Sequence, residues 1–145
     1  MSTTRRGQSS RSPHSDVFQI GDVAERVSLS LRTVRYYEES GLLMPVDRTV
    51  GGFRLYDNDA IDRLLLIKKM KPLGFTLDEM RALLTLRDEL LQPGLDPARR
   101  EDLHDRLKTW VVLAEEKLAA LRTQVGVAET FVTGLHQDVE QSKDR

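Results

Sequence analysis

The apolar positions near the start of the chain follow the spacing of short helices. In the first predicted helix they stand at i, i+3, i+4 and i+7, which places Ile20, Val23, Ala24 and Val27 on one face. Residues 28–30 break this pattern, and Ser30 is a favourable N-cap for a second helix from Leu31 to about Ser40. Gly41 follows where a helix often ends in glycine. Two short helices joined by a tight turn predict a helix-turn-helix.

The next segment, residues 45–56, predicts a β-hairpin. Gly51-Gly52 is a turn signal between two short stretches of strand-forming residues. A hairpin of this length is marginal alone and must pack on helices. Beside a helix-turn-helix it forms a wing.

Two more helices are predicted after the wing. Asp57 or Asn58 caps a helix that runs to about Leu73. A capping box between Thr76 and Glu79 then starts a helix that ends before residues 93–94, a Pro-Gly pair. Asp96-Pro97 restarts a helix, with Asp as the N-cap and Pro at the first helical position.

From residue 107 the apolar pattern becomes a heptad seam. Apolar residues are separated alternately by four and three positions over about four heptads. The predicted dimer interface consists of Leu107, Val111, Ala114, Leu118, Leu121, Val125, Ala128, Val132 and Leu135. A second helix must cover so narrow a stripe, and the simplest source is another copy of the chain. The alternating alanines favour an antiparallel pair, so we expect a homodimer.

The expected fold is therefore mainly α, with a winged helix-turn-helix domain carrying a small β-hairpin wing, followed by a long coiled-coil dimerisation helix. We expect a disordered basic tail over residues 1–16 and the winged domain over residues 17–92. The coiled-coil helix is expected over residues 96–136, and a flexible C-terminus over residues 137–145.

The charge distribution suggests which end meets an anionic partner. The net charge of the 145 residues is −1, but residues 1–75 hold 12 Lys and Arg against 9 Asp and Glu. Residues 76–145 hold 10 against 14, so the two parts carry +3 and −4. A basic front and an acidic back fit a protein that presents its first part to phosphate.

The second predicted helix has the composition of a recognition helix. Arg32, Arg35, Tyr36 and Glu39 share one face, whereas Tyr37 points toward the first helix. Arginine binds guanine edges or phosphates through two parallel hydrogen bonds. On an isolated helix, a solvated charged face is the simpler interpretation. The adjacent helix and wing favour entry into the major groove of DNA.

Composition excludes several other classes. The chain has no cysteine, and His14, His104 and His136 lie far apart, so we expect no disulfide, metal site or cofactor. No apolar run approaches the roughly 20 residues that span a bilayer, and no secretory signal is visible. We therefore expect a soluble cytoplasmic protein without membrane contact. No catalytic motif is present, so we expect no enzyme.

Four blocks of sequence, residues 18–24, 33–45, 52–56 and 73–79, together resemble the MerR family of bacterial transcription regulators. The most specific features are Arg-Tyr-Tyr-Glu at 35–38 and Gly-Phe-Arg-Leu-Tyr at 52–56. The resemblance implies a homodimer, joined by an antiparallel coiled coil, that binds palindromic double-stranded promoter DNA. It also implies that the bound DNA is bent or untwisted, which realigns the promoter for RNA polymerase.

The resemblance also assigns roles to residues by position. Arg35 and Tyr37 are expected to grip the DNA backbone. Bases or nearby phosphates are expected to face Arg32, Thr33 and Tyr36. The flanking strand is expected to be held by Arg48, Phe53, Arg54 and Tyr56 of the wing.

The chain departs from the family pattern in three places. Ser28 stands in the turn where glycine is common, and Phe53 stands where tyrosine is usual. The cysteines of the metal-sensing members are absent, and we expect no separate effector domain after the coiled coil. No residue pattern identifies a small-molecule effector. Two alternatives stay open: a short-form small-molecule sensor with a pocket at the junction of coiled coil and DNA domain, and an architectural DNA-binding protein acting through a protein partner.

Overall fold

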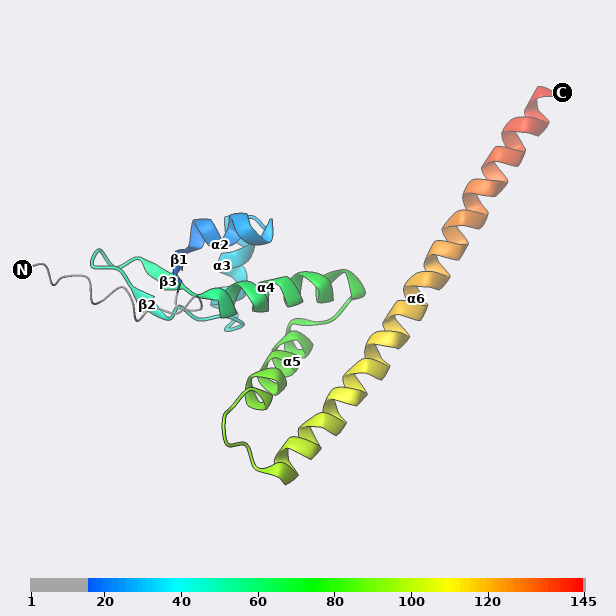
Figure 1. The fold of residues 1–145 in the computed structure, drawn as a ribbon. Helices are drawn as coiled ribbons and strands as arrows, with labels where there is room; N and C mark the ends of the chain where they lie inside the picture. Colours follow the sequence, from blue (N-terminus) through cyan, green and yellow to red (C-terminus); the bar gives the residue numbers. More distant parts are fainter. Residues whose placement is uncertain (1–15, 145) are drawn as a thin grey trace, which may run out of the picture. The chain divides into compact units, whose positions relative to one another are not determined.

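The computed structural model describes residues 16–144 (Figure 1). The predicted tail, residues 1–16, therefore lies outside the described residues except for Asp16. The chain divides into two compact units, the first ending at Arg87 and the second beginning at Asp88. This division falls earlier than the expected boundary at residue 92, within a helix rather than after it.

The helix-turn-helix consists of α2, Ile20–Val27, and α3, Leu31–Glu39, as the sequence predicts. The Ser30 side chain caps α3 by accepting a hydrogen bond of 3.0 Å from the Thr33 amide. Ser28 ends α2 in the left-handed conformation, with φ of 54°. Only glycine adopts this conformation without steric penalty, which explains why glycine suits this turn.

The wing is formed by β2, Asp47–Arg48, and β3, Arg54–Tyr56, and it belongs to a sheet of three strands. The third strand is β1, Phe18–Gln19, which pairs antiparallel with β3 and was not predicted. β3 is therefore the central strand, and the wing is anchored to the chain segment that leads into α2. Gly52, with φ of 90°, makes the turn at the wing's tip.

Two helices complete the first unit, α4 over Asn58–Met70 and α5 over Leu77–Leu90, which continues into the second unit. A 3-10 turn, η2, covers Lys71–Leu73 between them. Asp57 caps α4, and the predicted capping box starts α5, since Thr76 and Glu79 exchange hydrogen bonds of 2.9 and 3.1 Å. The core beneath α2, α3 and α4 contains fully buried Val23, Val34 and Leu64.

Basic side chains of α4 and α5 bind backbone carbonyls at the ends of the helix-turn-helix. Lys68 donates a hydrogen bond of 2.9 Å to the Val27 carbonyl at the end of α2. Arg63 donates one of 2.9 Å to the Leu42 carbonyl, and Arg81 binds the Ser40 carbonyl. The Val27 and Ser40 carbonyls lie at the ends of α2 and α3, and Leu42 lies in the loop that follows α3, so these bonds hold both helix ends and the loop against α4 and α5.

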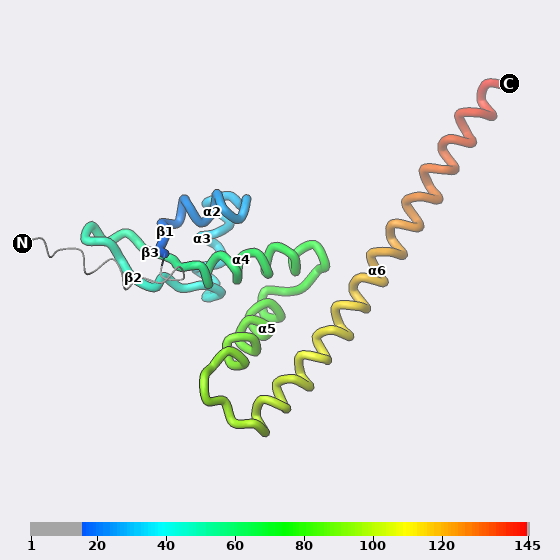
Figure 2. The backbone as a smooth tube through the Cα atoms, in the orientation of Figure 1, coloured from blue at the N-terminus to red at the C-terminus, as the bar shows by residue number. Residues whose placement is uncertain are grey.

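The second unit contains α6, Pro97–Lys143, which is one unbroken helix (Figure 2). Asp96 caps it by accepting a hydrogen bond of 3.3 Å from the Arg99 amide. The helix passes the expected end at residue 136, so the prediction of a flexible C-terminus is corrected to helix through Lys143. The residues after Gly134 include no proline or glycine to stop it. Within residues 16–144, no helix is long and apolar enough to cross a bilayer.

Candidate nucleic-acid interface

The outer face of α3 has the arrangement that the sequence predicts. Arg32, Arg35 and Glu39 are exposed, and Tyr36 is 52% exposed. Together with Leu31 they line a depression of about 600 Å³ on this face. Because Val34 packs into the core on the opposite side, the orientation of the two arginines and Tyr36 toward solvent is fixed by the burial of α3.

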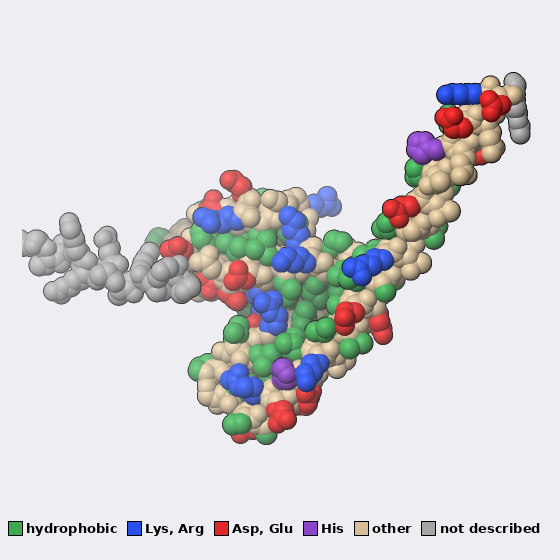
Figure 3. Space-filling view, turned by 45° about the vertical axis from the view of Figure 1, so that its right-hand side comes forward, with side chains coloured by type: hydrophobic (Ala, Val, Ile, Leu, Met, Phe, Trp, Pro, Cys, Tyr) green, Lys and Arg blue, Asp and Glu red, His purple; other side chains and the backbone are tan. Residues whose placement is uncertain are grey.

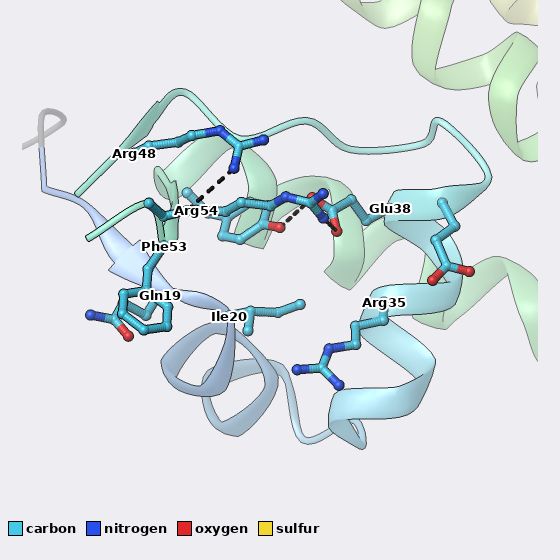
Figure 4. Close-up of a pocket in the computed structure, with 10 residues that line it drawn as sticks. Gln19, Ile20, Arg35, Glu38, Arg48, Phe53 and Arg54 are labelled. Carbon is cyan, nitrogen blue, oxygen red and sulfur yellow. Dashed lines mark hydrogen bonds and ion pairs between the residues drawn. The ribbon is translucent and has the colours of Figure 1, made fainter. Parts of the chain in front are cut away.

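A cleft of about 350 Å³ lies between α3 and the wing (Figure 4). The side chains of Arg35 and Glu38 line this cleft from α3, whereas those of Arg48, Phe53 and Arg54 line it from the wing. Arg48 donates a hydrogen bond of 3.3 Å to the Gly52 carbonyl, which holds its guanidinium along the hairpin. Three guanidinium groups thus border one cleft, a concentration of donors suited to phosphate oxygens.

Glu38 links the wing to α3. Its Oε1 accepts a hydrogen bond of 2.6 Å from Nη1 of Arg54, and its Oε2 accepts one of 2.5 Å from the Tyr56 hydroxyl. Tyr56 is completely buried. Burial, followed by its hydrogen bond to Glu38, raises the pKa of Tyr56 to about 12. The Tyr56 hydroxyl is therefore a neutral donor to the carboxylate at any physiological pH.

A second cleft, of about 440 Å³, borders the N-terminal part of α3. It is lined by Leu29, Arg32, Thr33, Tyr36, Tyr37, Lys68, Lys71 and Pro72. The Tyr36 and Tyr37 rings lie 5.4 Å apart between centroids, tilted by 60°. Lys68 and Lys71 were not among the predicted site residues, although the basic run at 68–71 is visible in the sequence. Lys68 and Lys71 lie near Arg32 because α4 packs against the helix-turn-helix. Sequence spacing does not reveal this packing.

The structure sorts the nine predicted DNA-binding residues by accessibility. Six are exposed: Arg32, Arg35, Tyr36, Arg48, Phe53 and Arg54. Thr33 is half-buried, and its hydroxyl accepts a hydrogen bond of 2.8 Å from Ser30. Tyr37 is 6% exposed, so only a group that enters the second cleft can touch it.

Tyr56 differs from the other predicted residues of the wing, because its side chain is buried. It nevertheless lines the cleft between α3 and the wing, and its contact with the flanking DNA strand stays a prediction. The Tyr56 hydroxyl donates a hydrogen bond to Glu38. Through this hydrogen bond Tyr56 connects the wing to α3.

Most of the predicted coiled-coil seam lies open along α6. Figure 3 shows apolar side chains recurring along this helix between charged ones. The exposed seam positions are Val111 at 54%, Leu118 at 40%, Val125 at 56%, Val132 at 50% and Leu135 at 49%, together with Ala128. Leu107, Ala114 and Leu121 are intermediate. Val139, one heptad after Val132 and 56% exposed, continues the seam beyond its predicted end.

Among residues 16–144, no three histidine, aspartate or glutamate side chains gather in a way that would hold a metal ion. The linings of the two clefts that border α3 include arginine, lysine and tyrosine side chains, and Glu38 and Glu39 also line the first cleft. The arginine, lysine and tyrosine side chains donate hydrogen bonds, and the arginines and lysines carry positive charge. The arginines and lysines are therefore the groups of this surface that can bind an anion.

The sequence matches two families of known proteins. Residues 18–86 match the family described as MerR HTH family regulatory protein, and residues 61–127 match the family described as MerR, DNA binding. The mercuric resistance operon regulatory protein of Bacillus cereus is 40% identical over 127 residues, which cover 88% of this chain and 89% of that protein.

Other relatives match over a smaller part of their length. The regulator CueR of Vibrio cholerae is 41% identical over 70 residues, 48% of this chain and 50% of its own. The nodulation protein NolA of Bradyrhizobium elkanii is 35% identical over 108 residues, 69% of this chain and 49% of its own. The chain thus spans about half the length of these two relatives. The crystal structure of the regulator SkgA from Caulobacter crescentus superposes with a TM-score of 0.51 and 27% identity, covering 88% of this chain and 80% of that one.

Proposed function

The chain belongs to the MerR family of DNA-binding transcription regulators, and we propose that it binds palindromic promoter DNA as a homodimer. The observation that carries the proposal is the convergence of Arg35 from α3 with Arg48 and Arg54 from the wing around one cleft. In the proposed complex, α3 enters the major groove of a half-site and the wing lies on the flanking backbone.

The accessible side chains divide naturally between these two tasks. Arg32, in the first turn of α3, and Tyr36, one turn later, face base edges or adjacent phosphates. Arg35, at the edge of the first cleft, binds the backbone together with the wing arginines. Lys71 borders the second cleft beside Arg32 and adds a phosphate contact there.

The seam along α6 supports the homodimer. Six of its nine predicted apolar residues are exposed in the single chain, and a second α6 would bury them. We propose the antiparallel arrangement, which places two winged units at opposite ends of the paired helices. A two-fold related pair of units matches a two-fold related DNA site.

Beyond binding, we propose that the dimer bends or untwists its site and so positions promoter elements for RNA polymerase, acting in the cytoplasm. The hydrogen bonds from Lys68, Arg63 and Arg81 support this proposal, because they hold the helix-turn-helix and the loop after it rigidly on α4 and α5. A rigidly held recognition helix can deform the DNA to which it binds. Deforming a site of 20–30 base pairs costs on the order of 1–6 kcal/mol, which phosphate contacts must offset.

The first test is selection of bound duplexes from a random pool at near-physiological salt, followed by anisotropy titration on the selected duplex. We expect Arg35→Ala to weaken binding to all sequences and to lower the slope of log affinity against log salt by about one unit. Arg100→Ala removes the same charge from an exposed position on α6 and serves as the control. A salt slope that stays the same for Arg35→Ala would remove its assignment to a phosphate.

A further inference from the structure

A buried carboxylate lies beneath a surface that is otherwise built to attract phosphate. The Glu38 side chain is 8% exposed and borders the cleft that also contains Arg35, Arg48 and Arg54. A negative charge at this place opposes DNA binding electrostatically. Glu38 must therefore make a favourable contribution that is larger than its repulsion of the DNA phosphates.

The contacts of Glu38 supply that role. Its two oxygens bind two donors of the same strand, Nη1 of Arg54 at 2.6 Å and the Tyr56 hydroxyl at 2.5 Å. Arg54 and Tyr56 are two residues apart on β3, so their side chains leave the same face of the strand. One carboxylate of α3 therefore holds β3 at two points (Figure 4).

The wing needs such a restraint. Its strands β2 and β3 are two and three residues long, and hairpins of this size are marginal unless they are packed. Arg54 remains 49% exposed while it is bound to Glu38. A guanidinium has five N–H donors, so it can bind a carboxylate on one side and present donors to a phosphate on another.

We propose that Glu38 is a positioning residue for DNA binding, holding the Arg54 guanidinium and the wing in fixed register with α3. The inference rests on the proposed function and adds to it a residue that does not touch DNA. Without Glu38, Arg54 loses its orientation and the wing its tie to the recognition helix. The positive charge then remains, but it is no longer placed for a phosphate oxygen.

The sign of the effect separates positioning from electrostatics. Glu38→Gln and the neighbouring Glu39→Gln both remove one negative charge from α3, and Glu39 is exposed on the outer face. Repulsion alone predicts tighter DNA binding by both variants. Positioning predicts that Glu38→Gln binds the selected duplex roughly 10- to 100-fold more weakly than wild type, the loss expected for one charge-assisted hydrogen bond. Equal or tighter binding by Glu38→Gln would overturn the inference.

A double-mutant cycle shows whether the effect passes through Arg54. Once Arg54→Ala has removed the positioned group, adding Glu38→Gln is expected to change the affinity by less than roughly threefold. A further loss as large as that in the wild-type background would mean that Glu38 acts on folding or elsewhere, and would reject its role toward Arg54.

A second variant covers the case in which Glu38→Gln does not fold. Tyr56→Phe keeps the buried ring and removes one of the two ties to Glu38, and we expect it to bind DNA several-fold more weakly than wild type. Unchanged affinity in this variant would also contradict the inference. If the wild-type chain itself selects no duplex, the proposed function fails. If wild type binds and the Glu38 variant binds as well, only the positioning role fails.

Discussion

Replacing Leu118 by aspartate tests the seam of α6 most sharply. Leu118 is 40% exposed in the single chain and lies at the centre of the seam, one heptad from Val111 and Val125. Full burial of a leucine contributes about 1.5–3 kcal/mol, so covering its exposed part contributes roughly 1 kcal/mol for each chain. A dimer that carries the Leu118→Asp change twice loses this contribution twice.

The introduced carboxylates reduce the free energy of association more than the loss of the leucines does. Each carboxylate enters an interface between two helices, where removing it from water costs several kcal/mol unless it is paired. Together the changes weaken association by at least roughly 5 kcal/mol, which raises the dissociation constant of the dimer by more than about 1000-fold. We expect Leu118→Asp to be monomeric at micromolar concentration.

Sedimentation equilibrium over a range of protein concentrations measures this effect directly. The matched control is Thr130→Asp, because residue 130 is exposed on the face of α6 opposite the seam and Thr and Asp have similar helix propensity. The control is expected to remain a dimer. If Leu118→Asp has the same dimer dissociation constant as the control, the seam is not the dimer interface.

Three further predictions concern the stability of the first unit. Since the folded pKa of Tyr56 lies near 12 and the unfolded value near 10, its stabilising contribution is complete below pH 10 and is lost as pH rises to 12. Between pH 10 and pH 12 the free energy of unfolding of the wild type, measured by urea denaturation, should fall by roughly 2–3 kcal/mol more than that of Tyr56→Phe. If the two free energies fall in parallel with pH, Tyr56 does not make this contribution. Thr76→Ala should lower the free energy of unfolding by about 1 kcal/mol because it removes the α5 cap, whereas Thr85→Ala, exposed in the same helix, should not. Ser28→Gly should raise the melting temperature, gaining roughly 0.5–1 kcal/mol by relieving the left-handed serine; an unchanged or lower value counts against strain at this turn.

The starts of α3, α5 and α6 were predictable from the sequence because single residues determine them. Ser30, Thr76 and Asp96 cap these helices, as predicted from their side chains, and of the two candidates Asp57 and Asn58 it is Asp57 that caps α4. A cap is a local interaction between residues three apart, so it needs no knowledge of the fold. The heptad seam is local in the same sense, since one helix carries its whole period.

The sheet was only partly predictable because it joins distant segments. β1 consists of two residues, and nothing in Phe18-Gln19 distinguishes a strand from an extended approach to α2. It becomes a strand only through pairing with Tyr56 and Leu55. Such long-range pairing leaves no periodic signal in so short a segment.

The contacts of Glu38 with Arg54 and Tyr56 were not predicted, for a related reason. In the sequence Glu38 resembles one more charged residue on a helix, and Tyr56 resembles a donor at the end of the wing. The spacing of Arg54 and Tyr56 does indicate that both lie on one face of a strand. That this face meets α3 depends on how the hairpin folds back, which only the tertiary structure shows.

Hydroxyl-radical footprinting of the selected duplex by the wild-type chain distinguishes a dimer that binds through α3 and the wing from other modes of binding. We expect two protected segments related by two-fold symmetry, with centres separated by about 10 base pairs or a multiple of that spacing. Protection outside the two centres, where the wings are proposed to lie, should be reduced when Arg54 is replaced by alanine. A single asymmetric footprint, or flanking protection unchanged by that substitution, would contradict binding by a dimer that reads DNA with α3 and holds it with the wing.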